Sequence, residues 1–120
     1  MLNLDTHILL KSMEGSLTLS ERTILTEDPE WGISAIVLWE ITKLHQLGRI
    51  RYGLDHPPVA AVLDKVRIWP ISREVCLSLR FLDFQSDPAD EIIAATSLTH
   101  DVALLTRDAR IKASRIVRCL

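Results

Sequence analysis

Short apolar stretches along the chain alternate with longer segments in which apolar residues recur every three or four positions. The first pattern predicts strands and the second predicts helices. The predicted strands cover residues 2–5, 31–34, 66–71 and 102–106, with a final edge strand at 115–119. The predicted helices cover residues 6–14, 20–27, 35–47, 58–65, 72–82 and 88–100, with a short helix after Asp108. Because strands alternate with helices, the pattern predicts an α/β fold around a mainly parallel sheet.

Several of the element boundaries follow from residues that start or stop regular structure. Gly15 and Gly48 end two predicted helices, and Ser20 is suited to cap the start of another. Pro70 lacks a backbone N–H, so it marks the end of the third strand or an edge position. No repeat, low-complexity tract or linker divides the chain, so residues 1–120 are expected to form one domain.

The helix predicted over residues 35–47 carries a charged residue inside its apolar stripe. At about 100° per residue, that stripe consists of Ile36, Val37, Ile41, Leu44 and Leu47. Glu40 falls in the middle of it. An unpaired carboxylate is costly to bury unless its pKa shifts. Glu40 is therefore expected to bind a metal ion, or else to reach solvent or pair with Lys43 at i+3.

The stretch S-D-P-A-D-E-I-I-A-A-T at residues 86–96 reads as the start of a helix. Asp87 is suited to be the N-cap and Pro88 to be the first helical residue, and Asp90 is a first-turn carboxylate. Residues 92–98 carry no charge, which predicts a helix that is buried nearly all round. The acidic start of this helix then opens into the body of the protein, where Asp90 can act as more than a helix cap.

Four acids are expected to meet at one edge of the predicted sheet. Asp5 and Asp108 directly follow strands, and Glu40 lies one turn into the helix after the second strand. Asp90 can reach the same edge from the start of its helix. In open α/β sheets, ligands bind outside the carboxyl ends of the strands. Taken singly, Asp5 and Asp108 are each also explained as helix N-caps.

Clustered carboxylates repel one another, so such a group destabilises the protein unless a cation neutralises it. Carboxylate oxygens are hard ligands that favour Mg²⁺ or Mn²⁺ over zinc. The histidines His7, His45, His56 and His100 show no zinc-ligand spacing. The acids therefore predict a magnesium or manganese site.

Composition and charge indicate which kinds of protein this chain can be, but they do not indicate a function. The chain is 48% hydrophobic with a net charge of −2, so binding to nucleic acid would need a local basic patch. The two cysteines, Cys76 and Cys119, are expected to be buried reduced thiols. No apolar run approaches the roughly 18 residues that span a membrane, and no signal pattern opens the chain. A cytoplasmic protein without membrane association is expected.

The acids lie within motifs that resemble a known family. The motifs are L-N-L-D-T-H at 2–7, S-A-I-V-L-W-E-I at 34–41, L-G-R-I at 47–50, D-P-A-D at 87–90 and L-L-T-R-D-A-R-I at 104–111. In this order and spacing they resemble PIN-domain ribonucleases, and among them the VapC-type toxins of toxin–antitoxin pairs. The resemblance implies a three-layer α/β/α sandwich with a parallel sheet.

The resemblance also implies an activity, a site and partners. It implies a Mg²⁺- or Mn²⁺-dependent endonuclease that cleaves RNA. The acidic site residues carried over are Asp5, Glu40, Asp90 and Asp108, and the residues that support them are Thr6 and Thr106. A cognate antitoxin that blocks the acidic cleft and a homodimer are implied as partners.

This sequence departs from the family pattern at a few positions. Gln85 and Ser86 precede D-P-A-D where relatives often carry a His-Arg or similar pair. Glu91 follows the second aspartate where many relatives carry arginine, and aromatic residues common after the first aspartate and at the C-terminus are missing. The departures leave the four acids intact and bear on substrate choice and on the fit to a partner.

The chemistry expected of this site is hydrolysis of a phosphodiester bond. We expect Asp5, Asp90 and Asp108 to bind the metal directly or through water, and Glu40 to hold a water molecule or a second ion. The sequence leaves open whether one or two ions bind.

RNA must be held by cations, because the acids repel phosphate. The candidates are Lys43, Arg49, Arg51, Arg107 and Arg110. Arg107 and Arg110 are favoured because they flank Asp108. Trp31 and Trp69 lie in predicted strands and are expected in the core or an interface, whereas Trp39 is a candidate for a partner surface.

Two other readings remain from the sequence. A phospho-receiver domain has similar length and acids at strand ends, but it needs an adjacent acidic pair where this chain has Asp5-Thr6-His7. The same three residues do not match a D-x-D phosphatase. A PIN-like module that binds RNA or protein without activity is the second alternative.

Overall fold

The computed structural model describes residues 1–120 and contains a four-stranded sheet in the order β3-β2-β1-β4. The strands are β1 (Leu2–Leu4), β2 (Trp31–Ser34), β3 (Arg67–Trp69) and β4 (Ala103–Leu105). Every neighbouring pair is parallel, with Asn3 opposite Gly32 in β2 and Leu104 in β4. The carboxyl ends of all four strands therefore lie at one edge, as predicted. β3 is an edge strand that stops before Pro70.

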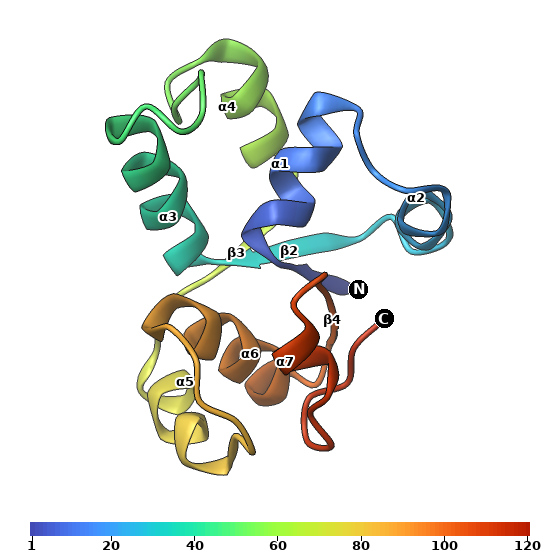
Figure 1. Cartoon of the computed structure of the whole chain (residues 1–120), viewed down its shortest axis with the longest axis vertical. Coiled ribbons are helices and arrows are strands. Elements are labelled where there is room, and N and C mark those ends of the chain that lie inside the picture. The colour runs from blue at the N-terminus through green and yellow to red at the C-terminus, as the bar shows by residue number, and fades with distance from the viewer.

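Helices cover both faces of the sheet. They are α1 (Thr6–Glu14), α2 (Leu19–Glu27), α3 (Ala35–Gln46), α4 (Pro57–Leu63), α5 (Arg73–Ser78), α6 (Pro88–His100) and α7 (Ala109–Lys112), and a 3₁₀ turn, η1, covers Leu79–Phe81. Figure 1 shows α1, α3 and α4 on one side of the sheet and α5, α6 and α7 on the other, with α2 beside them. This arrangement confirms the α/β class and the three-layer sandwich.

The core lies between the strands and these helices. Its fully buried members include Leu4, Ile8, Ile33, Ile93 and Leu104. The buried part of α6 runs from Ile93 to Ser97, which confirms the prediction for its uncharged stretch. Gly32 is needed in β2, because a Cβ there would lie 2.4 Å from two ring atoms of Trp69 on β3.

One fully buried polar side chain joins the sheet to α6. Asn3 of β1 donates through Nδ2 to the Ile93 carbonyl at 3.0 Å and to Ser97 Oγ at 2.9 Å, whereas its Oδ1 has no partner. Asn3 is two residues before Asp5, and Ile93 is three residues after Asp90. This contact therefore lies beside the segments that carry two of the four acids.

Helix boundaries follow the predictions closely at some ends and differ at others. Gly15 ends α1 with φ 73°, as expected for a left-handed C-cap. The N-cap of α2 is Thr18 and not Ser20, because Thr18 and Glu21 form a reciprocal capping box. Asp87 occupies the N-cap position of α6, but its side chain makes no capping hydrogen bond.

Four other predictions were wrong in detail. The segment 115–119 is not a strand and forms a single bridge, between Cys119 and Leu104 of β4. Two backbone hydrogen bonds make this bridge, from the Leu104 N–H to the Arg118 carbonyl and from the Leu120 N–H to the Leu104 carbonyl. The helix predicted to reach Leu82 ends at Ser78 and tightens into η1. Leu47 is the exposed C-cap of α3 and lies outside its apolar stripe. Cys76 is an exposed thiol, and Cys119 is partly buried.

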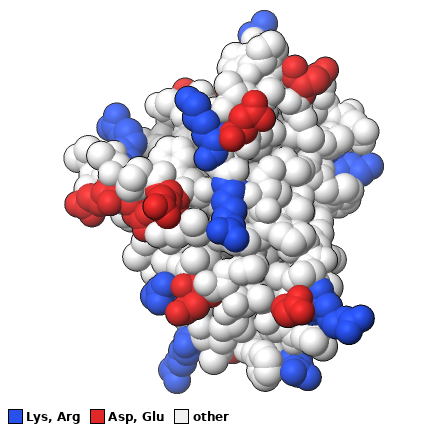
Figure 2. Space-filling view, turned by 180° about the vertical axis from the view of Figure 1, so that it is seen from behind, with Lys and Arg blue, Asp and Glu red and all other residues white.

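Charge is distributed without a single dominant patch on the face drawn in Figure 2. Acidic and basic side chains are interspersed there. None of the helices is both long and apolar enough to cross a membrane.

Candidate active site

Asp5 ends β1 and begins α1, which places its carboxylate at the centre of the sheet edge. The residue is only 5% exposed. Its Oδ1 accepts from the Thr6 backbone N–H at 2.8 Å, so Asp5 is an N-cap, as one reading of the sequence expected. Its Oδ2 accepts from Thr106 Oγ1 at 2.5 Å. Two neutral donors therefore fix the orientation of this carboxylate without compensating its charge.

Glu40 extends from the middle of α3 toward α1. Its Oε1 accepts from Thr6 Oγ1 at 2.5 Å. Lys43 instead contacts Gln46, with 3.3 Å between Nζ and Oε1, so the expected alternative of a Glu40–Lys43 pair is wrong. Burial raises the pKa of Glu40, and the negative charges of Asp5 and Asp90 raise it further, although the Thr6 hydrogen bond opposes the shift.

Asp90 lies in the first turn of α6, where the helix N-terminus favours a carboxylate. Its Oδ2 accepts from Ser86 Oγ at 3.0 Å. Burial raises the pKa of Asp90, the hydrogen bond from Ser86 lowers it, and the charges of Asp5 and Asp108 raise it further. Since Asp5 acts on both Asp90 and Glu40, the three carboxylates are electrostatic neighbours.

Asp108 follows β4 and caps α7. Its Oδ1 accepts from the backbone N–H groups of Arg110 at 2.8 Å and Ile111 at 3.1 Å. Its own N–H donates to Thr106 Oγ1 at 3.0 Å. The buried hydroxyl of Thr106 therefore contacts both Asp5 and the backbone of Asp108. The capping bonds use only Oδ1, so they do not occupy Oδ2.

An open cleft of about 620 Å³ lies beside these acids. It is lined by Ser86, Asp87, Asp90, Asp108, Ala109 and Arg110. A second, mainly apolar pocket of about 380 Å³ lies between α1, α4 and residues 50–52, and none of the four acids lines it. Of the four acids, Asp90 and Asp108 line the acidic cleft, whereas Asp5 and Glu40 do not.

The four carboxylates offer hard oxygen donors of the kind that Mg²⁺ and Mn²⁺ prefer. No three acidic, histidine or cysteine side chains are close enough together to bind one ion directly. Mg²⁺ commonly keeps several water ligands and uses one or two carboxylates. The raised pKa values of Glu40 and Asp90 also reflect negative charge that the protein leaves uncompensated. The donor set therefore fits a partly hydrated ion.

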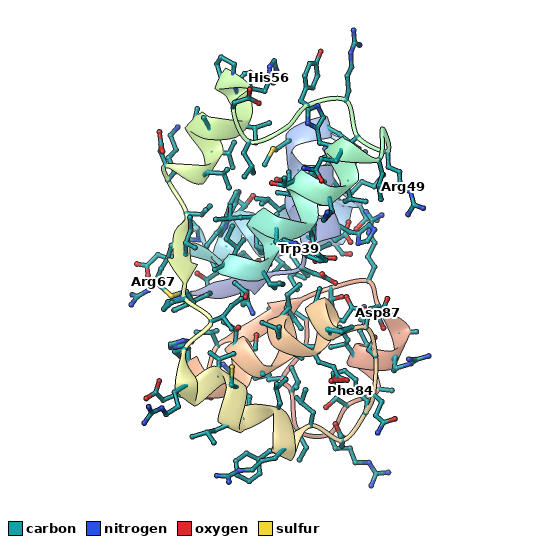
Figure 3. All side chains as sticks on the ribbon, turned by 90° about the vertical axis from the view of Figure 1, so that its left-hand side faces the viewer. Trp39, Arg49, His56, Arg67, Phe84 and Asp87 are labelled. Atoms are coloured by element: carbon teal, nitrogen blue, oxygen red, sulfur yellow. The ribbon has the colours of Figure 1, made fainter.

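The cations expected to hold RNA have different surroundings. Arg110 lines the cleft and donates from Nη1 to the Gln85 carbonyl at 2.8 Å. Lys43 and Arg49 are exposed, and Figure 3 shows Arg49 projecting from the same side of the molecule as Asp87 at the cleft. Arg51 lies over the Tyr52 ring, 5.4 Å from its centroid.

Arg107 is engaged elsewhere. Its Nε donates to Glu21 Oε2 at 2.7 Å and its Nη2 to Glu21 Oε1 at 2.6 Å. The hydrogen bond from Arg107 is the main cause that lowers the pKa of Glu21 to about 2, although partial burial opposes the shift. The side chain of Glu21 is 10% exposed, so this ion pair is partly shielded from solvent.

Sequence reasoning missed three residues near the site. Ser86 bonds Asp90, Glu21 holds Arg107, and His7 lies close enough to Glu40 to lower its pKa. Ser86 is four residues before Asp90, and the T-x-x-E capping box could have marked Glu21. Neither pattern specifies a contact with the site, because both describe only a helix start.

Comparison with protein families decides the class. The sequence matches the PIN domain over residues 3–116. The chain belongs to the PIN-domain family. Membership removes the receiver-domain alternative, and it agrees with the parallel sheet and the acidic edge described above.

Solved structures with the same fold include a chain of VapBC2 and a chain of a toxin–antitoxin complex. A chain of VapBC2 from Rickettsia felis bound to a promoter DNA fragment is 16% identical with a TM-score of 0.76, covering 100% of this PIN domain and 98% of that chain. A chain of a toxin–antitoxin complex from Klebsiella pneumoniae is 22% identical with a TM-score of 0.74, covering 100% and 96%. Comparison with curated protein sequences gives no significant match.

Proposed function

We propose that this PIN domain is a Mg²⁺- or Mn²⁺-dependent endoribonuclease and the toxin of a toxin–antitoxin pair. The main support is the electrostatic state of the four acids at the carboxyl edge of the sheet. Asp5, Glu40, Asp90 and Asp108 come from four separate segments, and their mutual repulsion contributes to the raised pKa values of Glu40 and Asp90. Such repulsion is costly to stability, and a bound cation would remove it.

Asp5, Asp90 and Asp108 would hold the ion, some of them through water ligands because no three lie close enough to bind it directly, and Glu40 would hold a water molecule or a second ion. When bound, such an ion supplies a lower pKa for a coordinated water and neutralises charge that develops on the phosphate. Thr6 and Thr106 would orient the carboxylates of Glu40 and Asp5 toward it.

The protein's own groups can serve the hydrolysis of a phosphodiester bond. Glu40, with its raised pKa, is suited to accept a proton from the attacking water. Arg110 lies on the wall of the cleft, where its guanidinium can attract an RNA phosphate. Lys43 and Arg49 are free to extend this contact along the backbone.

The toxin role rests on the known structures. The Klebsiella structure is described as a toxin–antitoxin complex, and 100% of this chain aligns with its matched chain and with that of VapBC2. We propose that an antitoxin protein binds this PIN domain and that two copies associate. Trp39 on α3 is 53% exposed and offers an apolar contact for such a partner.

A cleavage assay tests the enzymatic part. We expect wild-type protein to cut single-stranded RNA with millimolar Mn²⁺ or Mg²⁺ and not with a chelator. Asp90→Asn should lower the rate by more than about tenfold. Asp64→Asn is the matched control, because Asp64 is an exposed aspartate at the end of α4 and outside the cleft. Equal activity in both variants would contradict the proposal, and metal-dependent binding of RNA without cleavage would favour the inactive module.

Unfolding by denaturant tests the metal site without RNA. If Asp90 only supports its helix, Asp90→Asn should be weaker by under about 1 kcal/mol, with no effect of Mn²⁺ on either protein. If Asp90 binds metal, the metal-free variant should be as stable as wild type or more so, because one repelling charge is gone. Millimolar Mn²⁺ should then stabilise wild type more than the variant.

A further inference from the structure

Three consecutive residues between β4 and α7 have three different partners. Thr106 is buried and donates to Asp5 Oδ2. Asp108 caps α7 and donates its N–H to Thr106 Oγ1. Arg107, between them, extends instead to Glu21 of α2, 86 residues away in sequence. The segment therefore contacts the acidic cleft through Thr106 and Asp108 and α2 through Arg107.

The contact with α2 has the geometry of a fixed anchor. Two parallel hydrogen bonds of 2.7 and 2.6 Å join the guanidinium to the two carboxylate oxygens of Glu21. This bidentate arrangement restricts orientation more than a single charge contact does. Glu21 is itself held, because its Oε1 also accepts from the Thr18 backbone N–H at 2.8 Å. Arg107 is thus tied to the first turn of a capped helix.

The same geometry disfavours RNA as the partner of Arg107. Both oxygens of Glu21 are bound by Arg107, so a phosphate would have to displace a carboxylate from a partly shielded pair. The charges of the two groups also cancel, which removes the attraction that the phosphate backbone needs. Arg110 differs, because it lines the cleft and its guanidinium donates to a neutral backbone carbonyl.

We propose that Glu21 and Arg107 are a positioning pair that holds the Thr106–Asp108 segment in the geometry of the acidic site. Arg107 acts through its neighbours and does not contact RNA. The inference rests on the metal site of the proposed function, because the geometry matters only if the acids bind a metal ion.

A double-mutant cycle of Glu21→Gln and Arg107→Ala tests this role. Glutamine keeps an oxygen for the Thr18 N–H but loses the charge that binds Arg107. For the wild type, both single variants and the double variant, we would measure kcat, KM for RNA at two salt concentrations, and Mn²⁺ affinity by calorimetry.

Each single variant should lower kcat and Mn²⁺ affinity by about 10- to 100-fold, the usual range when an outer group that orients metal ligands is lost. KM and its dependence on salt should stay within about twofold of wild type. The double variant should be no worse than the more impaired single variant, because both changes remove one interaction. Arg22→Ala is the matched control, since Arg22 is an exposed arginine on α2 that forms no salt bridge.

Two results would overturn the proposal. The first result concerns RNA binding. In it, Arg107→Ala raises KM and reduces the salt dependence of RNA binding by about one unit of slope, whereas Glu21→Gln leaves kcat and Mn²⁺ affinity unchanged. This combination is expected if Arg107 contacts an RNA phosphate. The other is wild-type kcat and Mn²⁺ affinity in both single variants. Arg107→Lys keeps the positive charge but not the bidentate geometry, so its KM should equal that of wild type and its kcat should be lower. This variant replaces Glu21→Gln in the test if Glu21→Gln fails to fold.

The outcome is separable from the proposed function. If wild-type protein does not cleave RNA, the nuclease proposal fails, and the Mn²⁺ affinities of the four proteins still decide whether the pair positions the acids. If wild type cleaves RNA and the cycle shows no loss, only the positioning role fails.

Discussion

Glu21 of α2 is buried and Glu40 of α3 is partly buried, yet their surroundings shift the pKa values of these two helical glutamates in opposite directions. Glu21 meets the guanidinium of Arg107, which lowers its pKa to about 2. Glu40 meets a hydroxyl of Thr6 and two other acids, and burial with their charges raises its pKa.

The difference separates an acid that supports the fold from acids suited to bind a cation. No lysine or arginine side chain forms a salt bridge with Asp5, Glu40, Asp90 or Asp108. Hydroxyl groups of Thr6, Ser86 and Thr106 orient three of these carboxylates and leave their negative charge in place. Glu21 is therefore paired with a cation, whereas none of the four acids is, which leaves their negative charge able to attract a metal ion.

The largest effect is expected from removing the central acid. Asp5→Asn should abolish detectable RNA cleavage, a loss of more than about 100-fold, because even groups outside the metal ligands commonly account for 10- to 100-fold. The contrast with Asp64→Asn, measured in the same cleavage assay, controls for the loss of one negative charge. An Asp5→Asn variant that keeps a tenth of wild-type activity would contradict a central role for this acid.

A smaller effect is expected from removing a hydroxyl that orients an acid. Thr106→Val keeps the shape but leaves buried Asp5 Oδ2 without its donor, which should cost about 1–3 kcal/mol of stability and lower Mn²⁺ affinity by about 10- to 100-fold. Thr23→Val on the exposed face of α2 is the control. Denaturant unfolding and calorimetry measure the two effects, and unchanged Mn²⁺ affinity would show that the hydroxyl does not position Asp5.

The dependence of stability on pH should separate the two glutamates. Glu40 has a raised pKa in the folded state, so its contribution is greatest at low pH and is lost as the pH rises through that pKa. Glu21 has a lowered pKa, so its contribution is present above the ordinary glutamate range and is lost as the pH falls toward about 2.

Metal-free denaturant unfolding from acid to neutral pH measures this. Glu40→Gln should flatten the decline toward neutral pH, and Glu21→Gln should flatten the loss in acid. Identical profiles for the two variants would show that the two environments do not differ as the structure indicates.

The smallest effect is expected from the surface cations. Arg49→Ala and Lys43→Ala should each weaken RNA binding a few-fold and reduce its salt slope by about one, with Mn²⁺ affinity and kcat unchanged, because a single phosphate contact contributes weakly. Lys65→Ala, an exposed lysine next to β3, serves as the control. A loss of Mn²⁺ affinity in Arg49→Ala would place that residue nearer to the acids than its exposed position suggests.

Much of the fold could be predicted because local signals agreed with the tertiary arrangement. The short apolar strands, the left-handed Gly15 and the uncharged stretch of α6 all appear as expected. The predictions failed where local preferences competed. Ser20 and Thr18 can both cap a helix, and Thr18 is the N-cap because it forms a reciprocal capping box with Glu21. The segment 115–119 has strand-like residues, but its place beside β4 allows only one bridge.

The four acids could be selected from sequence because strand ends in a parallel sheet converge and because Glu40 interrupts an apolar stripe. Their partners could not. The contacts of Thr6 with Glu40, Thr106 with Asp5 and Arg107 with Glu21 join residues separated by 34, 101 and 86 positions. Nothing in the local pattern distinguishes Arg107, which binds Glu21, from Arg110, which lines the cleft.

The sequence by itself determined the α/β class, the parallel sheet and the edge at which the acids gather, since these depend on periodicity and on the order of elements. The tertiary structure alone decided which acids keep their charge uncompensated. That outcome depends on which side chains lie within hydrogen-bonding distance after folding, because electrostatic interactions and burial act through space and not along the chain.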